Sequence, residues 1–287
     1  MTKTAKRVRS VLCALVSFIM SLSLTGGVLC ISLYVTALNS NFAVSVIERS
    51  QYAELLSEEI KGEFISFGQA SNIENTFFDS LFESTDMVQR ISKDTEQMLR
   101  DFYAGNVHDS VSTDDLEAMW LEDLKEYATQ KDFELDDEML ENLQTVASEL
   151  GDVYNSYISV FSLSYFRTAS RMLARYSHYA LYAAVACAVM FIVTAVILRL
   201  FFNKKKNYLR YFIYAFSGAS LMLLAAPLAA LIGRVGNRIS ISSAALYTMA
   251  SSILNSIFAA VLISALVPIL CAVILAILWR RAYRKNV

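Results

Sequence analysis

Acidic side chains are absent from most of this chain. All 27 aspartate and glutamate residues lie between Glu48 and Asp152. Seven lysine or arginine residues share this acidic block, so its formal charge is −20, and the rest of the chain carries +18. The net charge of −2 therefore conceals two regions of opposite sign. An acidic surface of this strength argues against nucleic acid as a partner, because phosphate backbones bind basic surfaces.

Histidine and cysteine are also scarce, which bears on catalysis and metal binding. The chain has two histidines, His108 and His178, and four cysteines, none of them in the acidic block. Nucleophilic catalysis needs a nucleophile with a base in reach, and no Walker A, GxSxG, HExxH or CxxC motif occurs. His108 and Asp109 could form a base with its orienting carboxylate or a pair of metal ligands, but a lone histidine in a polar turn is more often solvated. We therefore expect no enzyme activity, no cofactor, no metal and no disulfide in the block.

Proline is nearly absent, and none precedes Pro227, so nothing in the acidic block forbids long helices. Apolar residues recur there at helical spacing, with acids on the other faces. The predicted helices run from Tyr52 to a C-cap at Gly68, from a capping box at Ser71–Glu74 to Gly105, from a cap at Ser112 or Thr113 through Tyr127, and from Asp136 to Phe161. Gly151 could break or kink the fourth helix, and the continuity of that helix with the next span stays open.

An even number of helices suits the placement of the block between two membrane spans. The chain leaves the membrane after the first span and must return to the same face for the second. We therefore expect an all-α protein: four transmembrane helices, with an antiparallel helical-bundle extracytoplasmic domain inserted between the first and second spans.

Long apolar runs predict the spans, since hydrophobic residues make up 55% of the chain and an uncharged run of about 18 or more residues is typical of a membrane helix. The predicted segments are an N-terminal tail (1–10), span one (11–38), the acidic helical domain (39–177), span two (178–202), a loop (203–210), span three (211–233), a loop (234–252), span four (253–279) and a C-terminal tail (280–287).

The first apolar run, from Val11 to Leu38, follows four basic residues and resembles a secretion signal. It is longer than a typical signal h-region of about 7–15 residues and continues into a helical pattern. We therefore predict an uncleaved signal anchor. Gly26 and Gly27 lie in its middle, where glycine either allows close helix packing or loosens the helix.

The distribution of basic residues predicts orientation. The two tails and the loop at 203–210 carry about four basic residues each, whereas the loop at 234–252 carries two. By the positive-inside rule both termini lie in the cytoplasm and the acidic domain lies outside. No N-x-Ser/Thr sequon occurs. Together these features predict a multi-pass plasma-membrane protein of a bacterial envelope.

Three arginines at helical spacing precede the second span: Arg167, Arg171 and Arg175 line one face, and Tyr176 and Tyr179 follow. Tyrosines at this place are typical of the aromatic belt at a membrane interface. The arginines would bind anionic lipid headgroups, pair with the acidic domain, or form a solvated face with snorkelling stems. These alternatives stay open.

The two prolines, Pro227 and Pro268, fall inside spans three and four. A membrane proline can mark a hinge at a transport site or a static kink that neighbouring helices tolerate. Small residues recur every four positions in these spans, which favours packing within one protein over self-association. No Asp, Glu, Lys or His lies in a span interior, where ion-coupled transporters usually place such groups.

The sequence therefore favours a non-enzymatic module for envelope interaction, sensing or assembly that acts through its acidic domain. Besides the lipid bilayer, the expected partners are a cationic protein or peptide outside the cell, or other membrane proteins. The alternative is a subunit of a channel or membrane transport complex.

Overall fold

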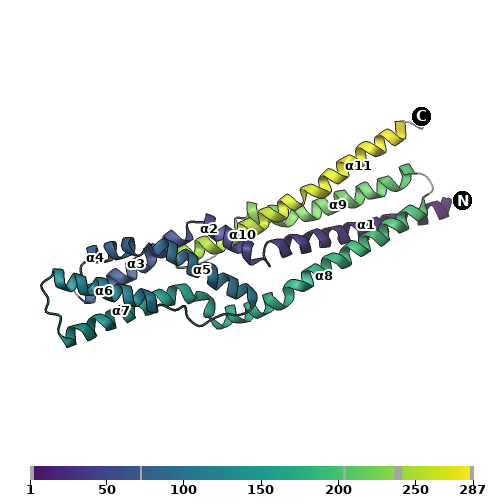
Figure 1. Cartoon of the computed structure of the whole chain (residues 1–287). Helices are drawn as coiled ribbons and strands as arrows, with labels where there is room; N and C mark the ends of the chain where they lie inside the picture. Colours follow the sequence, from purple (N-terminus) through teal and green to yellow (C-terminus); the bar gives the residue numbers. More distant parts are fainter. Residues whose placement is uncertain (1–2, 72, 203–204, 236–240, 285–287) are drawn as a thin grey trace. The chain divides into compact units, whose positions relative to one another are not determined.

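The structure is a computed structural model that describes residues 3–71, 73–202, 205–235 and 241–284. Throughout these ranges the regular elements are helices (Figure 1). The chain forms two compact units. The apolar unit comprises residues 1–39, 176–239 and 253–287, and the acidic unit comprises residues 40–175 and 240–252. The predicted all-α fold, with four long apolar helices and a helical region between the first and second, is confirmed.

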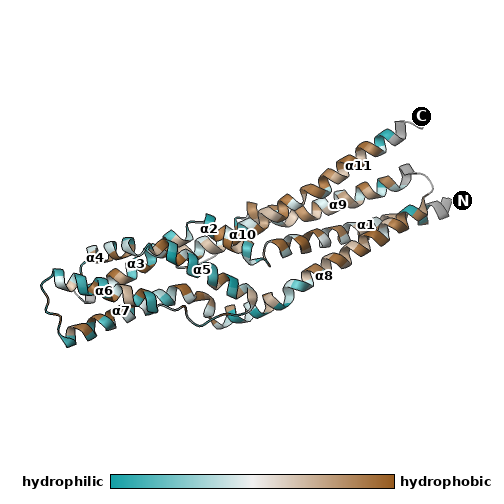
Figure 2. Ribbon diagram, viewed as in Figure 1, coloured by the Kyte–Doolittle hydropathy of each residue, from teal (hydrophilic) through white to brown (hydrophobic). Residues whose placement is uncertain are grey.

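The long apolar helices stand out in brown in Figure 2. They are α1 (Lys3–Val35), α8 (Ser164–Phe201), α9 (Lys205–Ile232) and the pair α10 (Ala244–Ser264) and α11 (Leu266–Arg284). Four stretches of them, residues 7–35, 164–201, 208–232 and 244–281, are long and apolar enough to cross a membrane. The chain thus carries the four candidate spans of a multi-pass membrane protein.

The two prolines occupy different positions in their helices. Pro227 lies inside α9, which continues through it. Pro268 lies in the first turn of α11, just after the break at Ala265 that separates α10 from α11. A proline in a first helical turn lacks only an N–H that would be unpaired there. Whether either proline acts as a hinge stays a prediction.

Helix α9 packs against both α1 and α11. A Cβ atom at Gly218 would lie 2.8 Å from Ser21 Oγ on α1, and one at Gly26 would lie 3.1 Å from Cys187 Sγ on α8. Gly26 therefore serves close packing, the first of its two predicted roles. Hydroxyl groups also join helices here, since Ser17 Oγ donates to the carbonyl oxygen of Tyr211 at 2.8 Å.

The acidic unit contains more helices than predicted. Its elements are α2 (Ser40–Arg49), α3 (Tyr52–Ala70), α4 (Asn75–Ser84), α5 (Met87–Ala104), α6 (Asp114–Gln130), α7 (Asp137–Ile158) and the 3-10 helix η1 (Ser159–Ser162). The single helix predicted between Ser71 and Gly105 is wrong, because the chain breaks into α4 and α5 at Asp86, whose φ is 46°. Positive φ removes the residue from a right-handed helix.

Aromatic rings from several helices form the core of the acidic unit. The ring of Trp120 on α6 is fully buried and lies 5.4 Å from Phe64 on α3 and 6.3 Å from Tyr154 on α7, between ring centroids. Phe78 on α4 is buried beside Phe64 at 6.3 Å. The predicted apolar stripes thus face one another, as the helical period requires.

Two of the predicted helix caps are present in the structure, and two are not. Asp136 caps α7 by accepting a hydrogen bond from Met139 N at 2.8 Å, and Gly105 ends α5 with φ 84°, both as predicted. The capping box is wrong: Ser71 is the C-cap of α3, and Glu74 precedes α4 without a side-chain cap. The C-cap at Gly68 is also wrong, since α3 continues to Ala70.

Gly151 does not break α7, which continues to Ile158. A Cβ atom there would overlap the carboxyl group of Glu117 on α6, so the glycine allows α6 and α7 to run close together (Figure 1). The interruption before α8 falls instead at η1 and Leu163. The fourth predicted helix is therefore separate from the second span.

One acid of the acidic unit reaches the start of α10. Glu59 Oε1 accepts the N–H of Ala245 at 3.0 Å, and Glu59 Oε2 accepts the hydroxyl of Ser243 at 2.8 Å. Ser243 Oγ in turn accepts Leu246 N–H at 3.1 Å. These bonds satisfy N–H groups that the first turn of a helix leaves unpaired.

Candidate functional site

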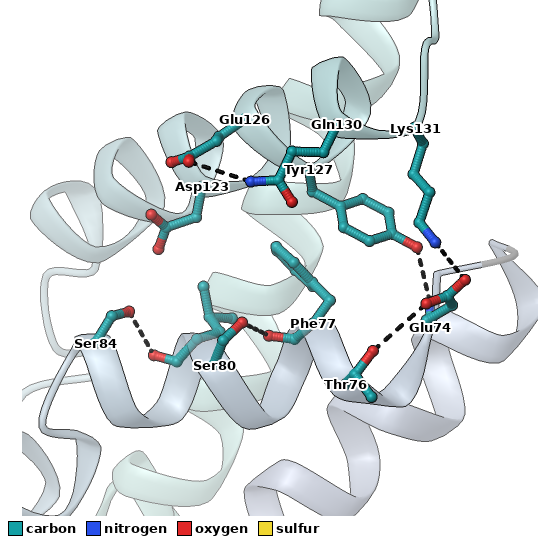
Figure 3. Close-up of a pocket in the computed structure, with 11 residues that line it drawn as sticks. Glu74, Thr76, Phe77, Ser80, Ser84, Asp123, Glu126, Tyr127, Gln130 and Lys131 are labelled. Carbon is teal, nitrogen blue, oxygen red and sulfur yellow. Dashed lines mark hydrogen bonds and ion pairs between the residues drawn. The ribbon is translucent and has the colours of Figure 1, made fainter.

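A groove lies between α4 and α6 in the acidic unit (Figure 3). Its volume is about 480 Å³. We call it the α4–α6 groove. The residues that give it its chemical character are three acids, two aromatic rings and one lysine: Glu74, Asp123, Glu126, Phe77, Tyr127 and Lys131.

Helix periodicity brings the groove residues of α6 together. Asp123, Glu126 and Tyr127 lie three and four positions apart, so they share one face, while Trp120 and Leu124 are buried in the core. Across the groove, the ring of Phe77 on α4 lies 4.9 Å from the ring of Tyr127 between centroids. The groove is thus built on two helices that the core holds in place.

The chain's own lysine occupies one end of the groove. Lys131 Nζ lies 2.5 Å from Glu74 Oε1 and 5.7 Å from the centre of the Tyr127 ring (Figure 3). The hydrogen bond from Lys131 lowers the pKa of Glu74 below its ordinary value, and the same bond raises the pKa of Lys131. Tyr127 also holds this end together, since its hydroxyl oxygen accepts Glu74 N–H at 3.2 Å.

The other end of the groove holds a carboxylate without a cation. Asp123 Oδ2 is buried, and no donor in the described part of the chain hydrogen-bonds to it. Burial raises the pKa of Asp123, and the charges of Glu126 and Glu122 raise it further. Glu126 itself accepts a hydrogen bond from Gln130 Nε2 at 3.2 Å. A cation placed here would offset the cost of burying the Asp123 charge and would reduce its repulsion from Glu122 and Glu126.

The groove contains acids and rings suited to holding a cation, and two of its serine hydroxyls are bonded to carbonyl groups of their own helix. Ser80 Oγ donates to the carbonyl of Phe77 at 2.7 Å, and Ser84 Oγ donates to that of Leu81 at 3.1 Å. Within the described ranges no cluster of three His, Cys, Asp or Glu residues is placed to hold a metal ion. Recognition of a cationic group is therefore the chemistry that this arrangement supports.

A second polar cluster joins three helices through Arg90 on α5. Arg90 Nε donates to Asp94 Oδ2 at 2.8 Å, and its other nitrogens bond to Asp115 at the start of α6. The hydroxyl of Tyr154 on α7 donates to Asp94 Oδ2 at 2.7 Å, where Asp94 is 6% exposed. The hydrogen bonds from Arg90 lower the pKa of Asp115, while burial and the charge of Asp94 raise that of Tyr154.

A cavity of about 440 Å³ beside this cluster includes His108. Of the two interpretations of His108, the structure favours the solvated residue over the pair with Asp109. His108 Nε2 lies 3.9 Å from Asp101 with its side chain 66% exposed, and Asp109 is taken by Arg167. The histidine is thus a solvated surface residue.

The structure separates the three arginines before the second span. Arg167 is paired with Asp109, so of the three predicted alternatives this residue follows the pairing with the acidic domain. Arg171 and Arg175 lie exposed on α8, and the exposed rings of Tyr176 and Tyr179 follow with centroids 5.7 Å apart. None of these residues lines the α4–α6 groove.

Sequence reasoning missed the groove. The spacing of Asp123, Glu126 and Tyr127 was a signal for a shared face, but Glu74 and Lys131 are 57 positions apart. Comparisons with protein-family models, with curated proteins and with solved structures gave no match to this chain.

Proposed function

We propose that this multi-pass membrane protein is a non-enzymatic interaction module whose acidic unit binds a cationic segment of another protein outside the cytoplasm. The observation that carries the proposal is that almost all acidic side chains of this unit lie outside its core. Asp94 is the only acid among the buried residues of the described chain, while the core is apolar and aromatic. The charge of −20 in the acidic block is therefore presented outward, where it attracts cationic partners.

The α4–α6 groove is the proposed point of attachment for one cationic side chain. Lys131 beside Glu74 and Tyr127 illustrates the geometry that an ammonium group takes there. Asp123 and Glu126 offer a second such position, with the rings of Phe77 and Tyr127 nearby. An ammonium group held by carboxylates and an aromatic face gains both charge attraction and cation–π contact.

The proposed orientation, with the acidic unit outside and both termini in the cytoplasm, is supported by the basic tails and the positive-inside rule. Single cysteines at His108 and Lys205, introduced after replacing the native cysteines, test it in intact cells. We expect a membrane-impermeant maleimide to label the first and to label the second only after the membrane is opened. The reverse pattern contradicts the orientation.

Binding is tested with the full-length protein in nanodiscs of phosphatidylcholine. A lysine-rich peptide and a peptide of the same length with glutamine in place of lysine are titrated at low and high salt. We expect the lysine-rich peptide alone to bind, and its affinity to fall as salt shortens the range of electrostatic attraction. Equal binding of both peptides, or affinity that salt does not change, contradicts the proposal.

A subunit of a channel or transport complex is the second candidate. The break between α10 and α11 at Ala265 favours it, since interrupted membrane helices often lie at transport sites. Ser264, beside this break, accepts a hydrogen bond from Ser32 of α1 at 3.0 Å. Ion flux through liposomes that contain the purified protein would support this candidate, and its absence in every ion gradient tested would count against an autonomous channel.

A further inference from the structure

Helix α8 carries a continuous exposed stripe in which basic, aromatic and aliphatic residues follow one another. Arg171, Arg175, Tyr179 and Tyr182 lie at intervals of four, four and three residues, so they share one helical face. All four are exposed, with Tyr179 56% and Tyr182 65% accessible. Figure 2 shows the same change along α8, from hydrophilic near its start to hydrophobic in its middle.

The length of α8 places this stripe relative to a bilayer. Twenty residues separate Tyr179 from Arg199 at the far end of the helix. At a rise of about 1.5 Å per residue they span about 30 Å, which is the thickness of the hydrocarbon core. If Arg199 marks one surface of the hydrocarbon core, Tyr179 falls at the opposite boundary, and Arg175, one turn earlier, falls at the depth of the lipid phosphates.

The two arginines of the stripe differ from the arginine before them in their ion pairing. Arg167 pairs with Asp109, but in the described ranges no acid lies within ion-pair distance of Arg171 or Arg175. Arg171 Nε makes a long bond of 3.4 Å to the carbonyl of Arg167 within its own helix, which leaves its charge unneutralised. No acid follows Asp152 in the chain.

We propose that Arg171 and Arg175, with the tyrosines below them, form a binding surface for the headgroups of anionic phospholipids. A guanidinium group forms paired hydrogen bonds with phosphate oxygens. Tyrosine rings occupy the interface next to the acyl chains, with their hydroxyls toward the headgroups. The net negative charge of phosphatidylglycerol, absent from phosphatidylcholine, gives the surface its selectivity.

The test measures the lipid composition beside the stripe in the full-length protein. A cysteine at His178, in a chain whose native cysteines are replaced, carries a bimane fluorophore. The protein is placed in vesicles of phosphatidylcholine and phosphatidylglycerol, with one lipid or the other brominated. The ratio of quenching by the two brominated lipids reports local enrichment. The variant R171Q/R175Q removes the stripe's charge, and R280Q/R281Q removes the same charge from the C-terminal end of α11.

We expect brominated phosphatidylglycerol to quench more strongly in the unaltered protein. Enrichment should fall by about fivefold for each arginine removed and stay unchanged in R280Q/R281Q. Lysine at both positions should keep part of the preference, since it keeps the charge and loses the paired bonds. Circular dichroism verifies that each variant retains its helices, and the single variants R171Q and R175Q replace the double variant if it does not fold.

Three results would overturn the proposal. They are equal quenching by the two lipids in the unaltered protein, enrichment that survives in R171Q/R175Q, and loss of enrichment on adding inorganic phosphate at constant ionic strength. The last result would assign the surface to free phosphate instead of lipid. Persistence of the preference in inorganic phosphate supports a lipid headgroup as the ligand.

Discussion

Glu59 on α3 and Ser243 before α10 are hydrogen-bonded at 2.8 Å although they are 184 positions apart. The same carboxylate accepts the N–H of Ala245 at 3.0 Å. An acid therefore caps the first turn of a helix that continues into the fourth candidate span. A negative group at a helix N-terminus is favoured by both hydrogen bonding and the helix dipole.

Removing this cap should loosen the start of α10. We expect E59A to raise hydrogen exchange at the amides of Ala245 and Leu246, with a loss of about 1–2 kcal/mol of local stability. The neighbouring Glu58 is exposed and no bond to α10 is seen, so E58A is the matched control. Equal exchange in the two variants would show that the carboxylate of Glu59 does not cap the helix.

The buried contact of Asp94 with Arg90 and Tyr154 should be the most sensitive polar feature of the acidic unit. D94A leaves Arg90 with Asp115 as its remaining carboxylate and removes the acceptor of the buried Tyr154 hydroxyl, so it should lower the free energy of unfolding by about 2–3 kcal/mol. Y154F removes one hydrogen bond and should cost about 1–2 kcal/mol. Trp120 packs against Tyr154, so its fluorescence reports unfolding in urea. An effect of D94A no larger than that of the exposed-site variant E141A contradicts this account.

Two glycines of α3 should respond to alanine in opposite directions. A Cβ atom at Gly68 would overlap the ring of the buried Phe78, so G68A should destabilise by about 1–3 kcal/mol. At Gly62 nothing lies within 4 Å of the added Cβ, so G62A should stabilise by up to about 1 kcal/mol through helix propensity. Urea unfolding of both variants gives the comparison, and a change of the same sign in both contradicts the packing of α3 on α4.

The ionised carboxylate of Asp123 should lower the free energy of unfolding at neutral pH. Its pKa is raised in the folded state, so the folded protein binds this proton more tightly than the unfolded chain does. The loss of folding stability caused by the ionised Asp123 is therefore present at pH values above the raised pKa, and it is absent below the ordinary value of 3.8. D123N should stabilise the protein at pH 7, by less than about 1 kcal/mol because solvent screens the charge.

Unfolding in urea at pH 7 and near pH 3 tests this dependence. The stabilisation by D123N should be seen at the higher pH and should vanish at the lower. Glu141 is exposed on α7 and does not line the groove, so E141Q serves as the control. A destabilised D123N at pH 7 would mean that Asp123 has an intramolecular partner.

Local patterns in the sequence predicted the features that depend on a few neighbouring residues. The cap at Asp136, the end of α5 at Gly105 and the apolar stripe through Trp120 follow from residue type and helical period. The break at Asp86 could not be predicted this way, because no glycine or proline marks it. None of the local signals behind the predicted helix ends, a cap, a glycine or a proline, encodes that break.

Contacts between distant residues explain the remaining differences. Ser71 and Glu74 form a local capping-box pattern, yet Glu74 bonds to Lys131, because the packing of α4 on α6 brings the two together. The groove depends on the same packing. A sequence alone places acids on a helical face, but the opposing face that turns them into a site comes from the tertiary fold.

Binding of a lysine-rich peptide to groove variants tests the central claim most directly. The full-length protein in phosphatidylcholine nanodiscs is compared with D123N/E126Q, which neutralises the groove, and with E141Q/E149Q, which removes the same charge from exposed positions on α7. The account predicts that D123N/E126Q weakens binding at least about tenfold, a loss of about 1.4 kcal/mol, and that E141Q/E149Q weakens it far less. Equal losses in the two variants would contradict a binding site in the α4–α6 groove, and no binding to the unaltered protein would contradict the proposed function itself.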